Sequence, residues 1–197
     1  MKLTWIGHAT FLLETDSGVR IVMDPVDEES GFSYSPLSAD ILTLSHRHHD
    51  HAATERVTGE PVLWEGEGTW SHRGVTASGI STFHDEKEGA LRGNNTVFVL
   101  EADGKRLAHL GDLGHSLGEE ALSKLKSLDV LLIPCGGTYT LDGVAAAKEA
   151  DRIGAKLTIP MHYKTESLRF PLATVDPFSD HVQTACRVLS VGETIIL

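Results

Sequence analysis

The chain has 197 residues, of which 41% are hydrophobic and 23% charged, and this composition predicts one globular domain over residues 1–197. With 17 Lys and Arg against 28 Asp and Glu residues, the formal net charge of −11 disfavours nucleic acid and anionic membranes as partners. No apolar run approaches the ~18 residues that a membrane span needs. The two cysteines, Cys135 and Cys186, are too few for a disulfide framework, so we expect a cytoplasmic protein in which both thiols are reduced.

Three short strands open the chain, which begins as a strand rather than as a signal peptide. Extended segments separated by glycine-containing turns cover residues 3–6, 9–14 and 18–23. His8 lies in the first turn, and Asp24 follows the third strand, immediately before Pro25. Asp24 is either a turn-forming residue or a hydrogen-bond acceptor for the imidazole of a metal ligand. The polar segments 26–39 and 87–95 predict loops that, together with residues 164–175, shape the substrate pocket and its specificity.

A group of metal-ligand side chains follows the next predicted strand, over residues 40–45. The segment 46–51 reads H-x-H-x-D-H. In a turn after a strand, His46 and His48 would converge on one ion, whereas Asp50 and His51 would serve a second point in space. Two neighbouring ions are therefore expected, and this ligand mix suits Zn²⁺ first, then Mn²⁺, Fe²⁺, Co²⁺ or Ni²⁺. A solvated histidine loop is the alternative, and the recurrence of ligand-type residues farther along the chain disfavours it.

The same pattern, an extended segment that ends at a ligand-type residue, recurs three times. The strand predicted over 75–83 ends at His84, which we expect to be the third ligand of the first ion, with a plain turn histidine as the alternative. Asp112 lies between glycines after a predicted strand and is placed to be a carboxylate shared by two ions. His162 follows another predicted strand and suits the last position on the second ion.

The second half of the chain alternates strands with helices. A capping-box spacing from Ser116 to Glu119 precedes an apolar stripe that reaches Leu128, which predicts a helix. Asp142 is expected to cap a second helix over residues 143–153. The remaining predicted elements are a short helix over 52–57, a helix from 176 to about 189, and strands over 62–64, 96–101, 106–110, 129–134, 156–160 and 193–197.

These segments resemble the metallo-β-lactamase superfamily, in particular the small stand-alone hydrolases grouped with ascorbate-6-phosphate lactonase. The matching stretches are residues 5–10, 23–25, 46–51, 82–84, 110–112 and 159–163. The resemblance implies an α+β fold, the αββα sandwich, in which two facing mixed β-sheets are flanked by helices. It also implies a metal site at one edge of the sandwich, where the loops after the strands meet.

Carried over to this sequence, the family pattern implies seven metal ligands. They are His46, His48 and His84 on the first ion, Asp50, His51 and His162 on the second, and Asp112 between the two. Members with a flavodiiron site carry Glu where this chain has His48, so zinc-type hydrolysis is favoured over an iron oxidoreductase. The nucleic-acid-cutting branch carries an inserted domain for which this chain has no room.

The expected function is a metal-dependent hydrolase with two Zn²⁺ per chain, acting through a metal-bound hydroxide on an ester, lactone or phosphoester bond of a small, anionic substrate. Asp50 would orient the hydroxide or receive its proton. His115, in the loop after Asp112, is the candidate catalytic residue for protonating the leaving group, with Tyr139, Tyr163 and Lys164 as alternatives. A non-hydrolytic metal-dependent binding or sensor protein is the competing interpretation, and a homo-oligomer is compatible with the sequence.

Overall fold

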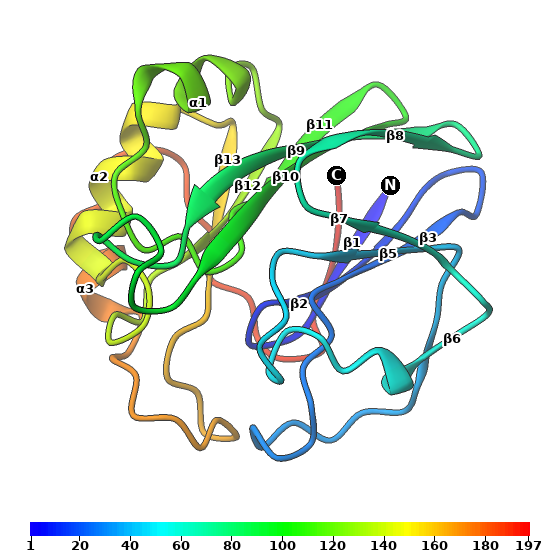
Figure 1. The fold of residues 1–197 in the computed structure, drawn as a ribbon, viewed down its shortest axis with the longest axis horizontal. Coiled ribbons are helices and arrows are strands. Elements are labelled where there is room, and N and C mark those ends of the chain that lie inside the picture. Colours follow the sequence, from blue (N-terminus) through cyan, green and yellow to red (C-terminus); the bar gives the residue numbers. More distant parts are fainter.

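The computed structural model describes residues 1–197 and contains two six-stranded sheets that face each other (Figure 1). The first sheet is built from β1 (Lys2–Gly7), β2 (Thr10–Glu14), β3 (Arg20–Met23), β5 (Ile41–Leu44), β7 (Val62–Glu65) and β14 (Thr194–Ile196). The second is built from β8 (Gly68–His72), β9 (Val75–Phe83), β10 (Asn94–Ala102), β11 (Lys105–His109), β12 (Val130–Pro134) and β13 (Leu157–Met161). Their strand orders are β14-β1-β2-β3-β5-β7 and β13-β12-β11-β10-β9-β8.

Both sheets are mixed, and their strand directions decide where the loops gather. In the first sheet β2 is antiparallel to both β1 and β3, and β3 is parallel to β5, so β1, β3 and β5 run the same way. In the second sheet β10 is antiparallel to both β9 and β11, and β11, β12 and β13 are parallel, so β9, β11 and β13 share a direction. The carboxyl ends of these strands therefore lie at one edge of each sheet.

The main hydrophobic core lies between the two sheets and comprises 43 buried residues. Alternation along the strands of the first sheet divides their side chains between two faces. Phe11 and Leu13 of β2 enter the main core, whereas Leu12 enters a smaller cluster on the outer face. Strand β12 is buried at every position, as expected for a parallel strand covered on both sides.

The helices α1 (Glu119–Lys124), α2 (Gly143–Ile153) and α3 (Asp176–Ser179) lie beside the second sheet, on the left in Figure 1. Helix α2 begins as predicted, because the Asp142 side chain accepts a hydrogen bond from the Ala145 N–H, and it ends at Gly154 in the left-handed conformation. The outer face of the first sheet is covered by β4 (Leu37–Ser38), the 3-10 turn η1 (Thr54–Arg56) and β6 (Val57–Thr58). The α+β sandwich expected from the sequence is confirmed.

The local predictions fail where tertiary pairing overrides helix propensity. The helix predicted from 176 to about 189 is the four-residue α3 only. Beyond it, the chain bonds to the edge of β13, with Thr158 N–H donating to Ala185 O at 2.8 Å and Arg187 N–H donating to Thr158 O at 2.9 Å. The helix predicted over 52–57 is a single 3-10 turn. No helix combines the length and the apolar character needed to cross a lipid bilayer.

Candidate metal centre

The residues that the sequence singles out stand directly after the strands that share a direction. His8 follows β1, Asp24 follows β3, and the hexapeptide 46–51 begins two residues after β5. On the second sheet, His84, Asp112 and His162 follow β9, β11 and β13. His8, Asp24 and His162 have φ angles of 53°, 45° and 53°. These left-handed conformations are uncommon for residues other than glycine and recur where a functional site imposes them.

The Asp112 carboxylate joins the two halves of the histidine cluster. Its Oδ2 atom lies 2.9 Å from Nε2 of His84 and 3.7 Å from Nε2 of His46. Its Oδ1 atom lies 3.1 Å from Nε2 of His51 and 3.2 Å from Nε2 of His162. Each carboxylate oxygen thus faces a different pair of imidazoles, which is the arrangement required of a carboxylate shared by two ions.

The donor atoms of this cluster fit metal ions. Four buried atoms make no hydrogen bond to the protein: Nε2 of His46, His51 and His162, and Oδ1 of Asp112. Such atoms are costly to bury without a partner. Two ligands of a tetrahedral ion with bonds of about 2.0–2.1 Å lie roughly 3.3 Å apart. The separations around Asp112, from 2.9 to 3.7 Å, bracket that value. Three imidazoles, those of His46, His48 and His84, also form a compact group of their own.

Hydrogen bonds at Nδ1 hold three of the imidazoles, those of His46, His51 and His84, with Nε2 turned inward. Nδ1 of His51 is 2.8 Å from Oδ2 of Asp24, and Nδ1 of His84 is 3.1 Å from the Tyr139 carbonyl oxygen. Nδ1 of His46 is 2.9 Å from Oγ of Ser45, whose hydroxyl in turn donates to Asp24. Acceptors placed in this way fix the tautomer and the orientation of a metal-binding histidine.

Burial and neighbouring charges set the protonation states. Burial, with His51 nearby, lowers the pKa of His46 to about 3. Burial, with His162 alongside, likewise lowers the pKa of His8 to about 3. Burial alone would raise the pKa of Asp112, but the imidazoles of His162 and His51 hold it well below its usual range. At neutral pH the His46 ring is therefore neutral and the Asp112 carboxylate ionised, which are the forms that bind metal ions.

His8 belongs to the same cluster, although the sequence pattern assigns it no role. Its Nε2 is 3.1 Å from Oδ2 of Asp50, and its ring centroid is 4.0 Å from that of His162. Its Nδ1 is buried and makes no hydrogen bond to the protein. The four side chains of His8, Asp50, His51 and His162 bring one donor atom each to within 4.8 Å of one another. His8 therefore fixes the position of the Asp50 carboxylate.

The loop that carries Asp112 is supported by residues that the sequence pattern did not identify. The Asn95 amide accepts the Asp112 N–H through Oδ1 at 2.9 Å and donates through Nδ2 to Leu110 O at 2.9 Å. Asn95 was expected in a loop, but strand β10 begins at Asn94. Nδ1 of His109 accepts the Gly111 N–H, while its Nε2 donates to Ala9 O at 2.8 Å. His109 thus packs inside the strand and supports the loop.

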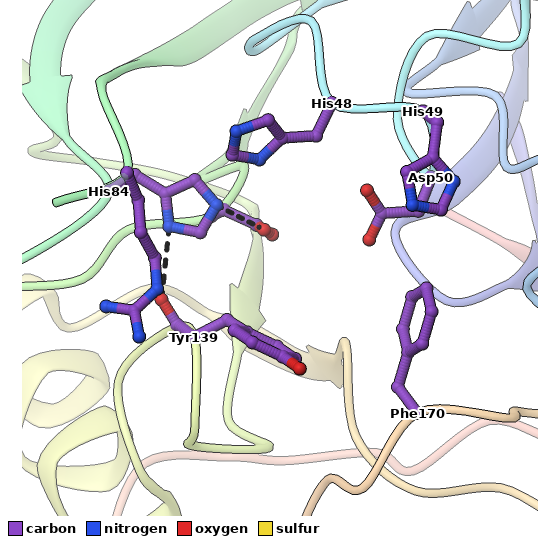
Figure 2. A pocket seen from close by; sticks show the side chains of 8 residues that line it. His48, His49, Asp50, His84, Tyr139 and Phe170 are labelled. Carbon is purple, nitrogen blue, oxygen red and sulfur yellow. Dashed lines mark hydrogen bonds and ion pairs between the residues drawn. The ribbon is translucent and has the colours of Figure 1, made fainter.

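Four of the seven predicted ligands, His48, Asp50, His84 and Asp112, line a cavity of about 370 Å³ at the edge of the sandwich. In Figure 2, His48, His49 and Asp50 surround the opening from one side, with His84, Tyr139 and Phe170 completing the wall. His48 is exposed and faces this opening, as Figure 2 shows, whereas His51 and His162 are buried. The wall also contains Arg92 and Asp112. A small molecule that enters this cavity meets the cluster directly.

The structure does not bring His115 into the cavity. Its Nε2 accepts the Phe83 N–H at 3.1 Å, and its ring lines a separate hollow beside α1. Tyr163 is buried with its hydroxyl toward Leu189 O, and the Lys164 ammonium donates to the carbonyl oxygens of Leu168 and Phe170. Among the four candidates for protonating the leaving group, only Tyr139 lines the cavity.

Comparison with known proteins places this chain in a recognised group. A family model described as the beta-lactamase superfamily domain matches residues 2–162. A UPF0173 metal-dependent hydrolase of Methanoculleus marisnigri is 32% identical over 99% of this chain and 96% of its own length. A second protein of that name, from Carboxydothermus hydrogenoformans, is 29% identical over the full length of both chains.

Solved structures agree with the sequence matches. A crystal structure from Thermotoga maritima superposes with a TM-score of 0.76 and 41% identity, over 91% of this chain and 84% of that one. That protein is described as a candidate Zn-dependent hydrolase of the metallo-β-lactamase superfamily.

Proposed function

Because this chain belongs to the metallo-β-lactamase superfamily, and within it to the UPF0173 metal-dependent hydrolases, we propose that it is a dinuclear zinc hydrolase acting on a small anionic molecule. The bond cleaved is an ester, lactone or phosphoester bond. The observation that carries this proposal is the Asp112 carboxylate, which turns one oxygen toward His46 and His84 and the other toward His51 and His162.

The proposed ligands divide between the two positions. His46, His48 and His84 would hold one ion, and Asp50, His51 and His162 the other, with Asp112 shared. Five imidazoles and two carboxylates form a nitrogen-rich set, which suits Zn²⁺ ahead of Mn²⁺, Fe²⁺, Co²⁺ or Ni²⁺. Two bound divalent ions would supply a water of lowered pKa and polarise the oxygen of the scissile bond.

The chain's own residues would then position the reactants. The Asp50 carboxylate lines the cavity, and the His8 imidazole holds its Oδ2 at 3.1 Å. The His51 imidazole keeps the pKa of Asp50 below its usual range even though burial opposes ionisation. We therefore assign Asp50 to orient the attacking water and to accept its proton at a carboxylate oxygen. The His84 ring, fixed by Tyr139 O, closes the opposite wall.

The test combines metal analysis with turnover. Protein purified without added metal salts should carry close to two equivalents of zinc, and should hydrolyse at least one member of a panel of para-nitrophenyl esters, lactones and phosphodiesters. Replacing His48 or Asp112 by Ala should abolish that hydrolysis. His72→Ala is the matched control, since His72 lies at the end of β8 outside the cluster and should leave both readouts unchanged.

Two outcomes would contradict the proposal in different ways. Two equivalents of metal with no turnover on any ester, lactone or phosphodiester would favour a metal-dependent binding or sensor protein. A coloured, redox-active protein that retains iron in place of zinc would favour an oxidoreductase.

A further inference from the structure

Arg92 is the only cationic lysine or arginine side chain in the wall of the cavity. Most arginines of this acidic chain pair with a carboxylate, as Arg47 does with Glu65 and Arg187 with Glu193. No carboxylate lies within ion-pair distance of the Arg92 guanidinium, which is half-buried. An arginine without a carboxylate partner is available to bind a ligand in the cavity. The paired N–H groups of its planar guanidinium can donate two hydrogen bonds to the oxygens of a carboxylate or phosphate group.

A single turn fixes the position of Arg92 relative to the metal cluster. The guanidinium donates from Nη2 to the Thr138 carbonyl oxygen at 3.1 Å. The next carbonyl along the chain, that of Tyr139, accepts from Nδ1 of His84, also at 3.1 Å. Thr138 has a φ angle of 60°, so the turn is bent into a left-handed conformation that presents both carbonyls to these side chains. The arginine and the proposed ligand His84 are thus held by consecutive residues of one turn.

The loop that carries Arg92 is also anchored from its own side. The Asp85 carboxylate, directly after His84 in the chain, is buried and accepts four backbone N–H groups of this loop. They belong to Lys87, Gly89, Leu91 and Arg92, at 2.7 to 3.1 Å. This loop was expected from the sequence to shape specificity, and the structure shows it folded around one carboxylate. Arg92 is therefore pre-organised before any ligand arrives, which lowers the entropic cost of binding.

Two aromatic rings line the same cavity as Arg92. The ring centroids of Tyr139 and Phe170 lie 6.4 Å apart at an interplanar angle of 80°. The guanidinium carbon of Arg92 is 5.6 Å from the centroid of the Tyr139 ring. Both rings line the cavity, as Figure 2 shows. Aromatic walls of this kind suit an apolar or flat segment of a ligand.

We infer that Arg92, Tyr139 and Phe170 form a subsite for a substrate whose scissile bond is joined, through an apolar segment, to a carboxylate or phosphate group. The anionic group binds the Arg92 guanidinium, and the apolar segment lies against the two rings. This inference rests on the proposed hydrolase function and narrows its substrate class.

The experiment compares esters that differ only in a terminal charge. Para-nitrophenyl hexanoate is the neutral substrate, the mono(para-nitrophenyl) ester of adipic acid supplies a carboxylate on the same chain length, and para-nitrophenyl ω-phosphonopentanoate supplies a phosphonate. The wild-type protein should prefer the anionic esters in kcat/KM, chiefly through a lower KM. Arg92→Gln should reduce that preference about tenfold or more, since charged hydrogen bonds carry that much discrimination. The more strongly preferred anion identifies the natural group as carboxylate or phosphate.

Two further variants distinguish specific recognition by the Arg92 guanidinium from nonspecific attraction by positive charge. Arg92→Lys keeps the charge without the planar fork and should retain part of the preference. Lys148→Gln removes a positive charge from the exposed face of α2, outside the cavity wall, and should leave the preference unchanged. Equal losses on neutral and anionic esters in Arg92→Gln, or an unchanged preference, would overturn the inference while leaving the hydrolase function intact.

A binding measurement covers the case in which none of these esters is hydrolysed, whether the proposed function has failed or extends only to lactones or phosphodiesters. Calorimetry on the metal-loaded protein would compare the monoanilide of adipic acid with hexananilide, its neutral counterpart. Tighter binding of the anionic anilide, weakened about tenfold in Arg92→Gln, supports the subsite. Equal affinities for the two anilides, or an anionic preference that survives the substitution, refute it.

Discussion

The Asp24 carboxylate accepts a hydrogen bond of 2.8 Å from Nδ1 of His51, and both side chains are buried. The same carboxylate accepts the Ser45 N–H through Oδ1 at 2.8 Å and the Ser45 hydroxyl through Oδ2, and that hydroxyl contacts Nδ1 of His46. Asp24 therefore orients His51 directly and His46 through Ser45. One carboxylate supports an imidazole in each half of the cluster, so its loss should affect both metal positions.

Asp24→Asn should weaken metal binding about 10- to 100-fold, the usual consequence of removing a hydrogen-bond partner behind a ligand. Asparagine suits the test because it tolerates the left-handed backbone that Asp24 adopts at φ 45°. Competition with a chromophoric chelator would measure the affinity. Asp16→Asn is the control, because it alters an exposed carboxylate that pairs with the N-terminal ammonium group. This variant should bind metal as the wild type does. Unchanged affinity in Asp24→Asn would mean that the negative charge of Asp24 is not needed to orient the two rings.

Substitutions at three proposed ligands should have distinguishable effects on metal stoichiometry. His48→Ala removes a ligand of one position and His162→Ala a ligand of the other, so each variant should retain about one of two equivalents. Asp112→Ala removes both shared oxygens and should lower occupancy at both positions, because its two oxygens face opposite halves of the cluster. Elemental analysis after exhaustive dialysis measures all three variants. If Asp112→Ala kept one full equivalent, the carboxylate would serve a single ion.

Much of the site followed from a simple rule, an extended segment that ends at a ligand-type residue. The rule works because β9, β11 and β13 share a direction, so that His84, Asp112 and His162 emerge at one edge. The structure brings these side chains together with the hexapeptide, and their role as metal ligands stays a prediction. This rule does not predict which loops contact one another. It therefore placed His115 toward the pocket, whereas the Phe83 N–H holds that ring elsewhere.

Other features depend on pairings that no local pattern encodes. Asn95 supports the Asp112 loop only because β10 lies between β9 and β11. The helix predicted from 176 onward begins there, with Pro177 in its first turn, but pairing of the following segment with Thr158 ends it after one turn. Arg92 lay in a loop expected to shape specificity, yet its connection to His84 runs through the distant turn at Thr138 and Tyr139.

Metal removal should destabilise the fold, because the buried donor atoms around Asp112 then lack partners. At a free metal concentration about 1,000-fold above Kd, binding to the native state contributes roughly 4 kcal/mol. For a chain of this size that corresponds to a fall in Tm of roughly 8–16 °C on adding chelator. Thermal unfolding followed by circular dichroism, with and without chelator, measures the shift. The same chelator should leave the Tm of Asp112→Ala nearly unchanged, and an identical Tm for wild-type protein in both conditions would contradict the prediction.

Gly111→Ala should lower both stability and metal affinity. Gly111 precedes Asp112 with a φ angle of 55°, and an added Cβ would lie 2.3 Å from Oδ1 of Asn95 and 2.5 Å from Cβ of Ser45. Gly104→Ala is the matched control, since Gly104 has a φ angle of 71° but no atom within 4 Å of an added Cβ. Both variants should lose ~1–2 kcal/mol of unfolding free energy to the left-handed backbone.

Gly111→Ala should lose a further ~1–3 kcal/mol to overpacking, measured by urea denaturation of the two variants side by side. It should also bind metal more weakly than Gly104→Ala, because the Asn95 amide that the new methyl group displaces is the one that accepts the Asp112 N–H. Equal losses in the two variants would show that the Asp112 loop moves aside at little cost, and the shared carboxylate would then be held less rigidly than its hydrogen bonds indicate.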